Sequence, residues 1–112
     1  MEKLTHITSL DLSSNKIQIL SEGISKLIEL EHLDLSDNQL QALPEGLSNL
    51  KKLKKLDLSE NPLASVSVIK YLETAPKGLA VTISKDLVNE IKASKNYKEI
   101  ISRCHIRYLL DG

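Results

Sequence analysis

The sequence has no Phe or Trp, three Tyr and one Cys among its 112 residues. A hydrophobic core must therefore be built from Leu, Ile and Val. The single cysteine, Cys104, has no partner for an internal disulfide, so we expect a reducing compartment or no dependence on cysteine. Basic and acidic residues are balanced at 15 each. This balance gives no overall field that would draw the chain to nucleic acid or to an anionic membrane.

Long apolar runs are also missing. No run approaches the roughly 18 residues that a membrane-spanning helix needs. The N-terminal segment lacks the apolar stretch of a secretion signal. We therefore predict no membrane association and expect a cytoplasmic, intracellular location. The length predicts one small domain with a modest core.

What the sequence does contain is an internal repeat with a 23-residue period. Shifting the chain by this period aligns apolar residues or asparagines in seven columns through three copies. The columns are Leu4/Leu27/Leu50, Ile7/Leu30/Leu53, Leu10/Leu33/Leu56, Leu12/Leu35/Leu58, Asn15/Asn38/Asn61, Ile17/Leu40/Leu63 and Leu20/Leu43/Val66. Each copy contains Leu-Asp-Leu, an alternation typical of a half-buried strand. One such strand cannot bury its leucines alone, but parallel stacking of the copies closes a continuous core.

This pattern resembles the leucine-rich repeat family, Leu-x-x-Leu-x-Leu-x-x-Asn-x-Leu, here with a Leu-Pro variant at Leu43-Pro44. The first copy departs from it with Ser21 in place of Pro44, and the third departs after Val66. The resemblance implies an α/β solenoid with a parallel β-sheet on its concave face. It also implies protein–protein recognition, as in intracellular adaptors, signalling scaffolds and bacterial proteins delivered into host cells.

The asparagines fall where each copy must turn away from the sheet. An Asn amide can pair with turn backbone groups that would otherwise be buried without a partner. We therefore interpret Asn15, Asn38 and Asn61 as structural, and the resemblance implies that they form a ladder. The outer segments 21–27 and 44–50 are short and contain glycine, which favours a turn or a loose helical turn.

The last third of the chain departs from the repeat. The same shift aligns Leu56 and Leu58 with Leu79 and Val81, which predicts a degenerate fourth strand at 78–83. A short helix is predicted over 67–74. Ser84 is suited to N-cap a helix over 85–95, and Asn96 with Glu99 has capping-box spacing for a second helix ending near Asp111. The predicted organisation is repeats at 4–26, 27–49 and 50–72, a fourth strand at 78–83 and a helical C-terminal cap at 84–111.

Two features at the ends of this organisation leave alternatives open. The last helix is apolar over more than one stripe, so it either caps the repeats or also binds a partner, including a second copy of the chain. Little sequence precedes Leu4 to cover the first repeat. That edge is therefore exposed, covered by another chain, or part of a longer protein.

Catalytic chemistry is not indicated. The histidines His6, His32 and His105 have no singled-out nucleophile beside them. Cys104 and His105, placed on the predicted helix, would point about 100° apart, and Cys104 is interpreted as a buried structural thiol. No Gly-rich phosphate loop and no paired Cys/His metal spacing is present. We predict no enzyme activity, no cofactor and no metal site.

The residues between the strand leucines are predicted to face the concave side. Asp11, Asp34 and Asp57 would form a column of carboxylates about 4.8 Å apart, either a habit of the scaffold or a contact for a cationic group. Gly78, Ala80 and Thr82 would extend the face on the fourth strand. We assign partner binding to the exposed residues of this face and its rim: Ser9, Asp11, Ser13, Glu31, His32, Asp34, Ser36, Asp37, Lys54, Lys55, Asp57 and Ser59.

The predicted function is a protein–protein interaction module that binds a protein partner through this face and the adjoining loops. The alternative is a structural or assembly domain that self-associates, as a weak homodimer, through the N-terminal edge or the last helix. Charge is polarised along the chain, with net −3 over residues 1–66 and +3 over 67–112. This polarity either favours head-to-tail contact between copies or is incidental.

Overall fold

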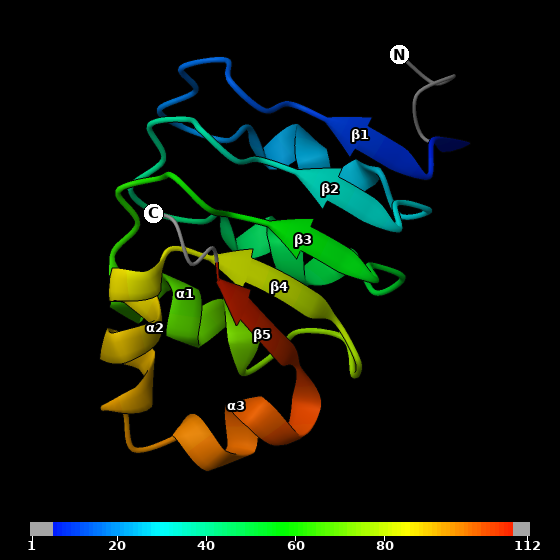
Figure 1. Cartoon of the computed structure of the whole chain (residues 1–112). Helices are drawn as coiled ribbons and strands as arrows, with labels where there is room; N and C mark the ends of the chain where they lie inside the picture. Colours follow the sequence, from blue (N-terminus) through cyan, green and yellow to red (C-terminus); the bar gives the residue numbers. More distant parts are fainter. Residues whose placement is uncertain (1–5, 109–112) are drawn as a thin grey trace.

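The computed structural model describes residues 6–108, and they form one parallel sheet with helical segments on its outer side (Figure 1). The strands are β1 (Ser9–Asp11), β2 (His32–Asp34), β3 (Lys55–Asp57), β4 (Ala80–Ile83) and β5 (His105–Tyr108). Their order in the sheet is their order in the chain. The predicted short α/β solenoid with a parallel sheet is confirmed.

The sheet register follows the repeat in its first half and changes in its second half. Leu10 pairs with Leu33 and Leu33 with Leu56, at the spacing that the repeat predicts. Leu56 then pairs with Val81, so the predicted alignment of Leu56 with Leu79 is wrong by two residues. The next step, from Val81 to Ile106, is longer than the repeat by the same amount. A two-residue shift leaves every side chain on its expected face, because side chains alternate with period 2.

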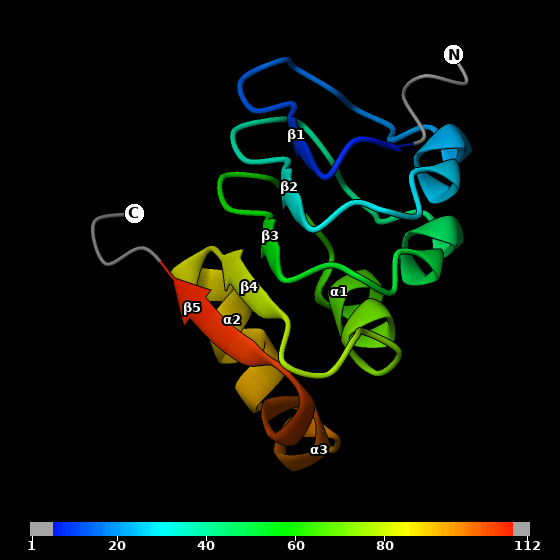
Figure 2. The same ribbon diagram turned by 90° about the vertical axis from the view of Figure 1, so that its right-hand side faces the viewer.

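The outer side of the sheet explains the longer period. The first two repeats cross it in five-residue 3-10 helices, η2 (Glu22–Lys26) and η3 (Glu45–Asn49), which confirms the predicted loose turns. The third repeat uses an eight-residue α-helix, α1 (Ser65–Leu72), close to the predicted 67–74. Figure 2 shows η2, η3 and α1 one below another, to the right of β1, β2 and β3. The longer helix requires a longer repeat.

The predicted C-terminal helix is only half correct. Helices α2 (Lys85–Lys92) and α3 (Tyr97–Arg103) form, but α3 ends before Cys104, whose backbone is extended. Residues 105–108 form β5 instead of helix, and residues 109–112 lie outside the described part of the chain. The His105 N–H donates to the Leu79 carbonyl at 2.8 Å. Cys104 and His105 are therefore successive residues of extended chain, and the prediction that they share a helix is wrong.

The two residues predicted to cap these helices occupy the expected positions but bond elsewhere. Ser84 precedes α2, and its hydroxyl accepts the Glu60 N–H at 3.1 Å. Asn96 precedes α3, and its side-chain amide donates to the Glu73 carboxylate. Neither side chain caps its own helix. Each one ties a helix start to the neighbouring repeat.

The core lies between the sheet and the outer helices and is built from aliphatic side chains. The central strand residues Leu33, Leu56 and Val81 are no more than 2% exposed. Cys104 is buried, as predicted, and burial raises the pKa of its thiol. At the two ends of the sheet, Leu10 and Ile106 are only partly buried. The core is thus complete in the middle of the solenoid and thinner at its ends.

The asparagine ladder is confirmed. The Asn38 side-chain oxygen accepts the N–H groups of Asn15 and Ile17, both at 3.0 Å. Its amide nitrogen donates to the carbonyls of Leu12, Leu35 and Ser36 at 3.0–3.1 Å. One copy further on, the Asn61 oxygen accepts the Leu40 N–H at 3.0 Å, and its amide nitrogen donates to the carbonyls of Leu35, Leu58 and Ser59. Asn38 and Asn61 therefore each join two adjacent turns.

Candidate functional site

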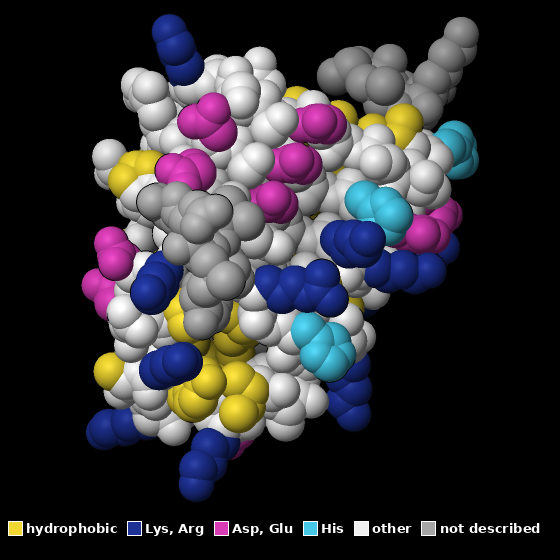
Figure 3. Space-filling view, in the orientation of Figure 1, with side chains coloured by type: hydrophobic (Ala, Val, Ile, Leu, Met, Phe, Trp, Pro, Cys, Tyr) yellow, Lys and Arg dark blue, Asp and Glu magenta, His cyan; other side chains and the backbone are white. Residues whose placement is uncertain are grey.

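The concave face carries two rows of side chains that run across the strands. The row at the strand starts is Ser9, His32, Lys55, Ala80 and His105, and the row at the strand ends is Asp11, Asp34, Asp57, Thr82 and Arg107. We call His32, Lys55 and His105 the basic row and Asp11, Asp34 and Asp57 the acidic row. Figure 3 shows acidic side chains along one side of this face and Lys and His side chains along the other.

Each carboxylate of the acidic row is held by the serine two residues later. Oδ1 of Asp34 accepts the Ser36 N–H at 2.9 Å and the Ser36 hydroxyl at 2.6 Å. The other two carboxylates make the same pair of bonds to Ser13 and Ser59. In the first repeat, these bonds from Ser13 lower the pKa of the Asp11 carboxyl. One carboxylate oxygen in each repeat therefore belongs to the scaffold.

The predicted serines thus serve the turns. Ser59 is buried and Ser13 and Ser36 are partly buried, with their hydroxyls pointing to the aspartates. Their donor groups are occupied, which leaves them little to offer a partner. The second oxygen of each aspartate, Oδ2, accepts no hydrogen bond from the described residues of the protein. The three Oδ2 atoms are the acceptors available on the acidic row.

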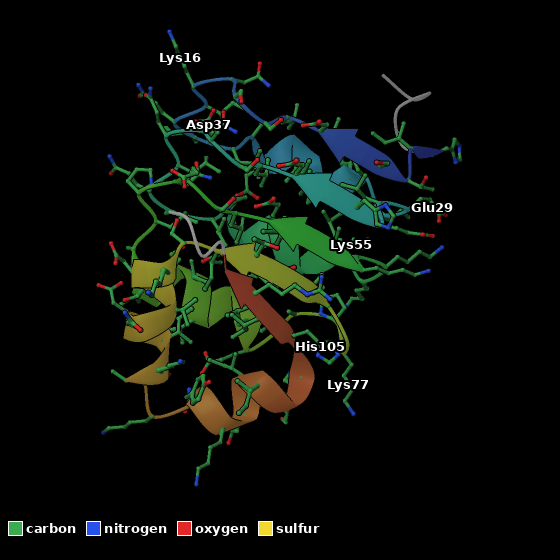
Figure 4. The ribbon with its side chains drawn as sticks, viewed as in Figure 1. Lys16, Glu29, Asp37, Lys55, Lys77 and His105 are labelled. Carbon is green, nitrogen blue, oxygen red and sulfur yellow. The ribbon has the colours of Figure 1, made fainter. Side chains whose placement is uncertain are left out.

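Three predicted residues lie at the rim and are engaged in contacts within the chain. The Glu31 carboxylate lies 3.5 Å from the Lys54 ammonium. Asp37 accepts the Ser14 hydroxyl at 2.8 Å, and its φ of 55° places it in the left-handed region that the turn requires. Figure 4 shows Asp37 in the loop beyond the strand ends, whereas Lys55 lies near the strand starts.

The side chains of the basic row make fewer contacts within the chain than those of the rim. His32, Lys55 and His105 are exposed, and they form no ion pair within the described part of the chain. Ala80 separates Lys55 from His105 in the row, and its small side chain leaves space between the two. The row is about two strand spacings, or roughly 10 Å, from Lys55 to His105. Lys55 and His105 are both labelled at this end of the sheet in Figure 4.

His105 and Arg107 were missed as concave residues because their segment was predicted as helix. They could have been found by shifting the sequence against itself by two residues more than the repeat period. This shift aligns Leu72 with Tyr97, Ala75 with Ile100, Leu79 with Cys104 and Val81 with Ile106. This alignment puts a fifth strand at 105–108. Its exposed residues extend the concave face beyond the predicted fourth strand.

The acidic row, together with His32 and Lys55 of the basic row, lines a shallow hollow of about 350 Å³. All five strands contribute to it, and Ala80, Thr82 and Arg107 lie in its lining. The predicted concave positions of Ala80 and Thr82 are therefore confirmed, whereas Gly78 precedes β4. Among residues 6–108, no group of three or more His, Cys, Asp or Glu side chains is arranged to hold a metal ion. No helix in this range is long and apolar enough to cross a membrane.

A leucine-rich repeat family model matches residues 5–63, more than half of the chain. The chain belongs to the leucine-rich repeat family. It is also similar to the solved structure of a leucine-rich repeat protein of Leptospira interrogans, at 33% identity and a TM-score of 0.64. That match covers 89% of this chain and 25% of the Leptospira chain, so this leucine-rich repeat chain spans about a quarter of the length of that protein. No curated protein matches it.

Membership of the leucine-rich repeat family suggests a protein-interaction module in general terms, and the family is typically non-enzymatic. The scaffold positions of the repeat are accounted for by the core and the asparagine ladder. What is particular to this member is the sequence of its exposed concave residues. These residues divide into the basic row and the acidic row, at opposite ends of the strands.

Proposed function

We propose that this leucine-rich repeat protein binds a protein partner through its concave face, with no catalytic role. The observation that carries the proposal is the division of the face into the acidic row and the basic row, at opposite ends of the same short strands. A segment with separated cationic and anionic groups would complement both rows at once. Charge complementarity of this kind sets the orientation and register of a partner more than it sets raw affinity.

The rigidity of the acidic row supports the proposal. Each aspartate is fixed by its two bonds to serine, at 2.6–3.0 Å. The remaining oxygen is thereby oriented before any partner arrives. Binding then costs little side-chain entropy, because the acceptor is already held in position. Neighbouring carboxylates about 4.8 Å apart repel each other by somewhat under 1 kcal/mol in water, and a cationic group would relieve that repulsion.

The size of the face limits the affinity. Five strands spaced by about 4.8 Å span roughly 20 Å. A concave patch of that width offers a few hundred Å², against about 800 Å² on each side of a standard interface. The partner must therefore also contact the rim, where Glu31, Asp37 and Lys54 lie. We expect weak binding by the concave face alone.

The experiment is a pull-down from the native cell with charge variants that spare the fold. Asp34→Asn removes the charge and keeps an oxygen to accept the two Ser36 bonds. Lys55→Glu reverses the charge at the centre of the basic row, and His32→Ala removes its neighbour. Each of the Asp34 and Lys55 variants is expected to reduce recovery of the partner several-fold, and the combined variant with His32→Ala is expected to abolish it.

The matched control is Lys26→Glu, which reverses an exposed lysine on η2, on the opposite side of the sheet. It should bind as the unmodified chain does. Melting temperatures of all variants should stay within a few degrees of one another, because the altered groups are exposed or partly exposed. Unchanged recovery by the combined variant would show that the partner, if one is captured, does not use the concave face.

A further inference from the structure

The two outer strands of the sheet are complementary in register. Strand β1 has a partner only at β2 and strand β5 only at β4, so each has one edge without a strand among the described residues. All strands are parallel. A strand β1 added beside β5 in the same direction would continue the existing sheet. Such open edges are the usual template for strand addition.

The backbone groups at the two edges match the pattern inside the sheet. In the interior, the Leu58 N–H donates to the Thr82 carbonyl at 2.7 Å, and the His105 N–H donates to the Leu79 carbonyl at 2.8 Å. Continuing the pattern, the Tyr108 N–H would donate to the Asp11 carbonyl of an added copy. The Ser9 N–H of that copy would donate to the Cys104 carbonyl.

The apolar side chains at the edges are incompletely covered. Leu10 and Ile106 occupy the same column as Leu33, Leu56 and Val81, but they are only partly buried. Beyond β5, an open groove of about 580 Å³ is lined by apolar side chains of α2, α3 and β5 together with charged groups. Ile101, which lines it, is 46% exposed. Stacking a first repeat on this end would cover Ile106 and Leu10 together.

The charges at the two ends are opposite. Residues 6–49 contain two basic and seven acidic residues, whereas residues 84–108 contain six basic and three acidic residues. In the continued register, Arg107 of one copy would stand beside Asp11 of the next, one strand spacing away. The end carrying β5 therefore attracts the end carrying β1 and repels a second β5 end.

We propose that copies of this chain associate head to tail, with β1 of one copy adding in parallel to β5 of the next. The contact is heterologous, so it does not close at a dimer and extends the solenoid. The edges are short, and the buried area is below that of a standard interface. The association is accordingly weak, salt-sensitive and visible at high protein concentration. The proposal does not depend on the concave face binding another protein.

The first measurement is sedimentation velocity of the full chain from about 10 μM to about 1 mM, at low and at high salt. The weight-average mass is expected to rise with concentration past twice the chain mass of 12.5 kDa. It should fall when the salt is raised, because exposed charge pairs are screened. A monomer at every concentration, or a mass that levels off at a closed dimer, overturns the proposal.

The second measurement is a charge swap. Arg107→Glu would face Asp11 of the next copy, and Asp11→Lys would face Arg107 of the previous one. Each variant alone is expected to associate about tenfold more weakly, because a weak attraction between exposed charges is replaced by a weak repulsion. Mixed in equal amounts, the two variants restore association, since contacts that join opposite charges then become available.

The matched control is Asp34→Lys, which makes the same change one strand inside the edge and loses the same serine bonds. It should associate as the unmodified chain does. Circular dichroism establishes that each variant is folded. Association unaffected by either edge variant overturns the proposal, as does a failure of the mixed variants to restore it. Asp34→Asn, which tests the concave face, leaves self-association unchanged, so the two proposals fail separately.

Discussion

The asparagine ladder makes a prediction about stability that distinguishes two copies of the same motif residue. Asn38 is buried between two turns, whereas Asn15 is exposed at the end of the ladder. The perturbation is Asn38→Ala, compared with Asn15→Ala. Both changes remove the same amide from the same repeat position. They differ in how many backbone groups lose a partner and in whether water can replace it.

The magnitude follows from the bonds that each amide makes. The Asn38 oxygen accepts two N–H groups, and its two amide hydrogens are shared among three carbonyls. At about 1 kcal/mol for each hydrogen bond, the loss is roughly 4 kcal/mol, because the groups left behind are largely shielded from water. Asn15 is exposed and donates to the carbonyls of Leu12 and Ser13, at 2.9 and 3.0 Å. Water can replace those bonds, so Asn15→Ala should cost about 1 kcal/mol or less.

The assay is urea unfolding followed by circular dichroism, with a thermal melt beside it. For a chain of this length, 1 kcal/mol shifts the melting temperature by about 4 °C, so Asn38→Ala is expected to lower it by about 15 °C. A domain is stable by about 5–15 kcal/mol, so the variant keeps only part of its folding free energy. Equal losses for Asn38→Ala and Asn15→Ala would refute the reasoning, since they would show that the leucine core alone sets stability.

Three further outcomes test the packing. Gly46→Ala would bring a Cβ within 2.8 Å of the Ser25 Cβ, so it should lower the free energy of unfolding by about 1–3 kcal/mol. The Cβ of Gly23→Ala would contact only the Ser21 hydroxyl, at 3.3 Å, so this change should cost about 0.5 kcal/mol or less. Equal urea midpoints for the two variants would contradict this difference. Tyr71→Phe should be neutral or stabilising by about 1 kcal/mol, because the Tyr71 hydroxyl is buried without a hydrogen-bond partner among the described residues. A clear fall in melting temperature would mean that the hydroxyl is used. Cys104 should react with a thiol reagent about 100-fold more slowly in the native protein than in urea, because it is buried and burial raises the pKa of its thiol. Equal rates would place the thiol at the surface.

Much of the fold could be predicted because the repeat recurs at a fixed period in the sequence. Residues such as Leu33 and Asp34 alternate at period 2, and their recurrence from copy to copy fixes which strands are neighbours. The side chains that face the concave surface follow directly from that alternation. The same reasoning identified Asn38 as a structural residue. It follows a strand where the chain turns, and the backbone groups of that turn need a hydrogen-bond partner.

The last strand could not be assigned in the same way. Residues 105–108 are too few for an alternation of two to be told from a helical stripe. Their conformation is decided by the hydrogen bond from the His105 N–H to the Leu79 carbonyl and by the pairing of Ile106 with Val81. These contacts join segments that α2 and α3 separate in the chain. The period itself lengthens because α1 is longer than η2 and η3, and helix length depends on packing against the sheet as much as on local preference.

The sequence by itself determined the repeat, its inward leucines and the acidic row, because each follows from alternation within a strand and its recurrence every 23 residues, and it marked the recurring asparagines as structural. Only the tertiary structure decided that Glu31 and Asp37 are engaged at the rim and that His105 and Arg107 join the concave face. Those outcomes depend on contacts between distant residues, such as the pairing of β4 with β5. Local spacing therefore set the scaffold, and nonlocal strand pairing set the surface that the scaffold presents.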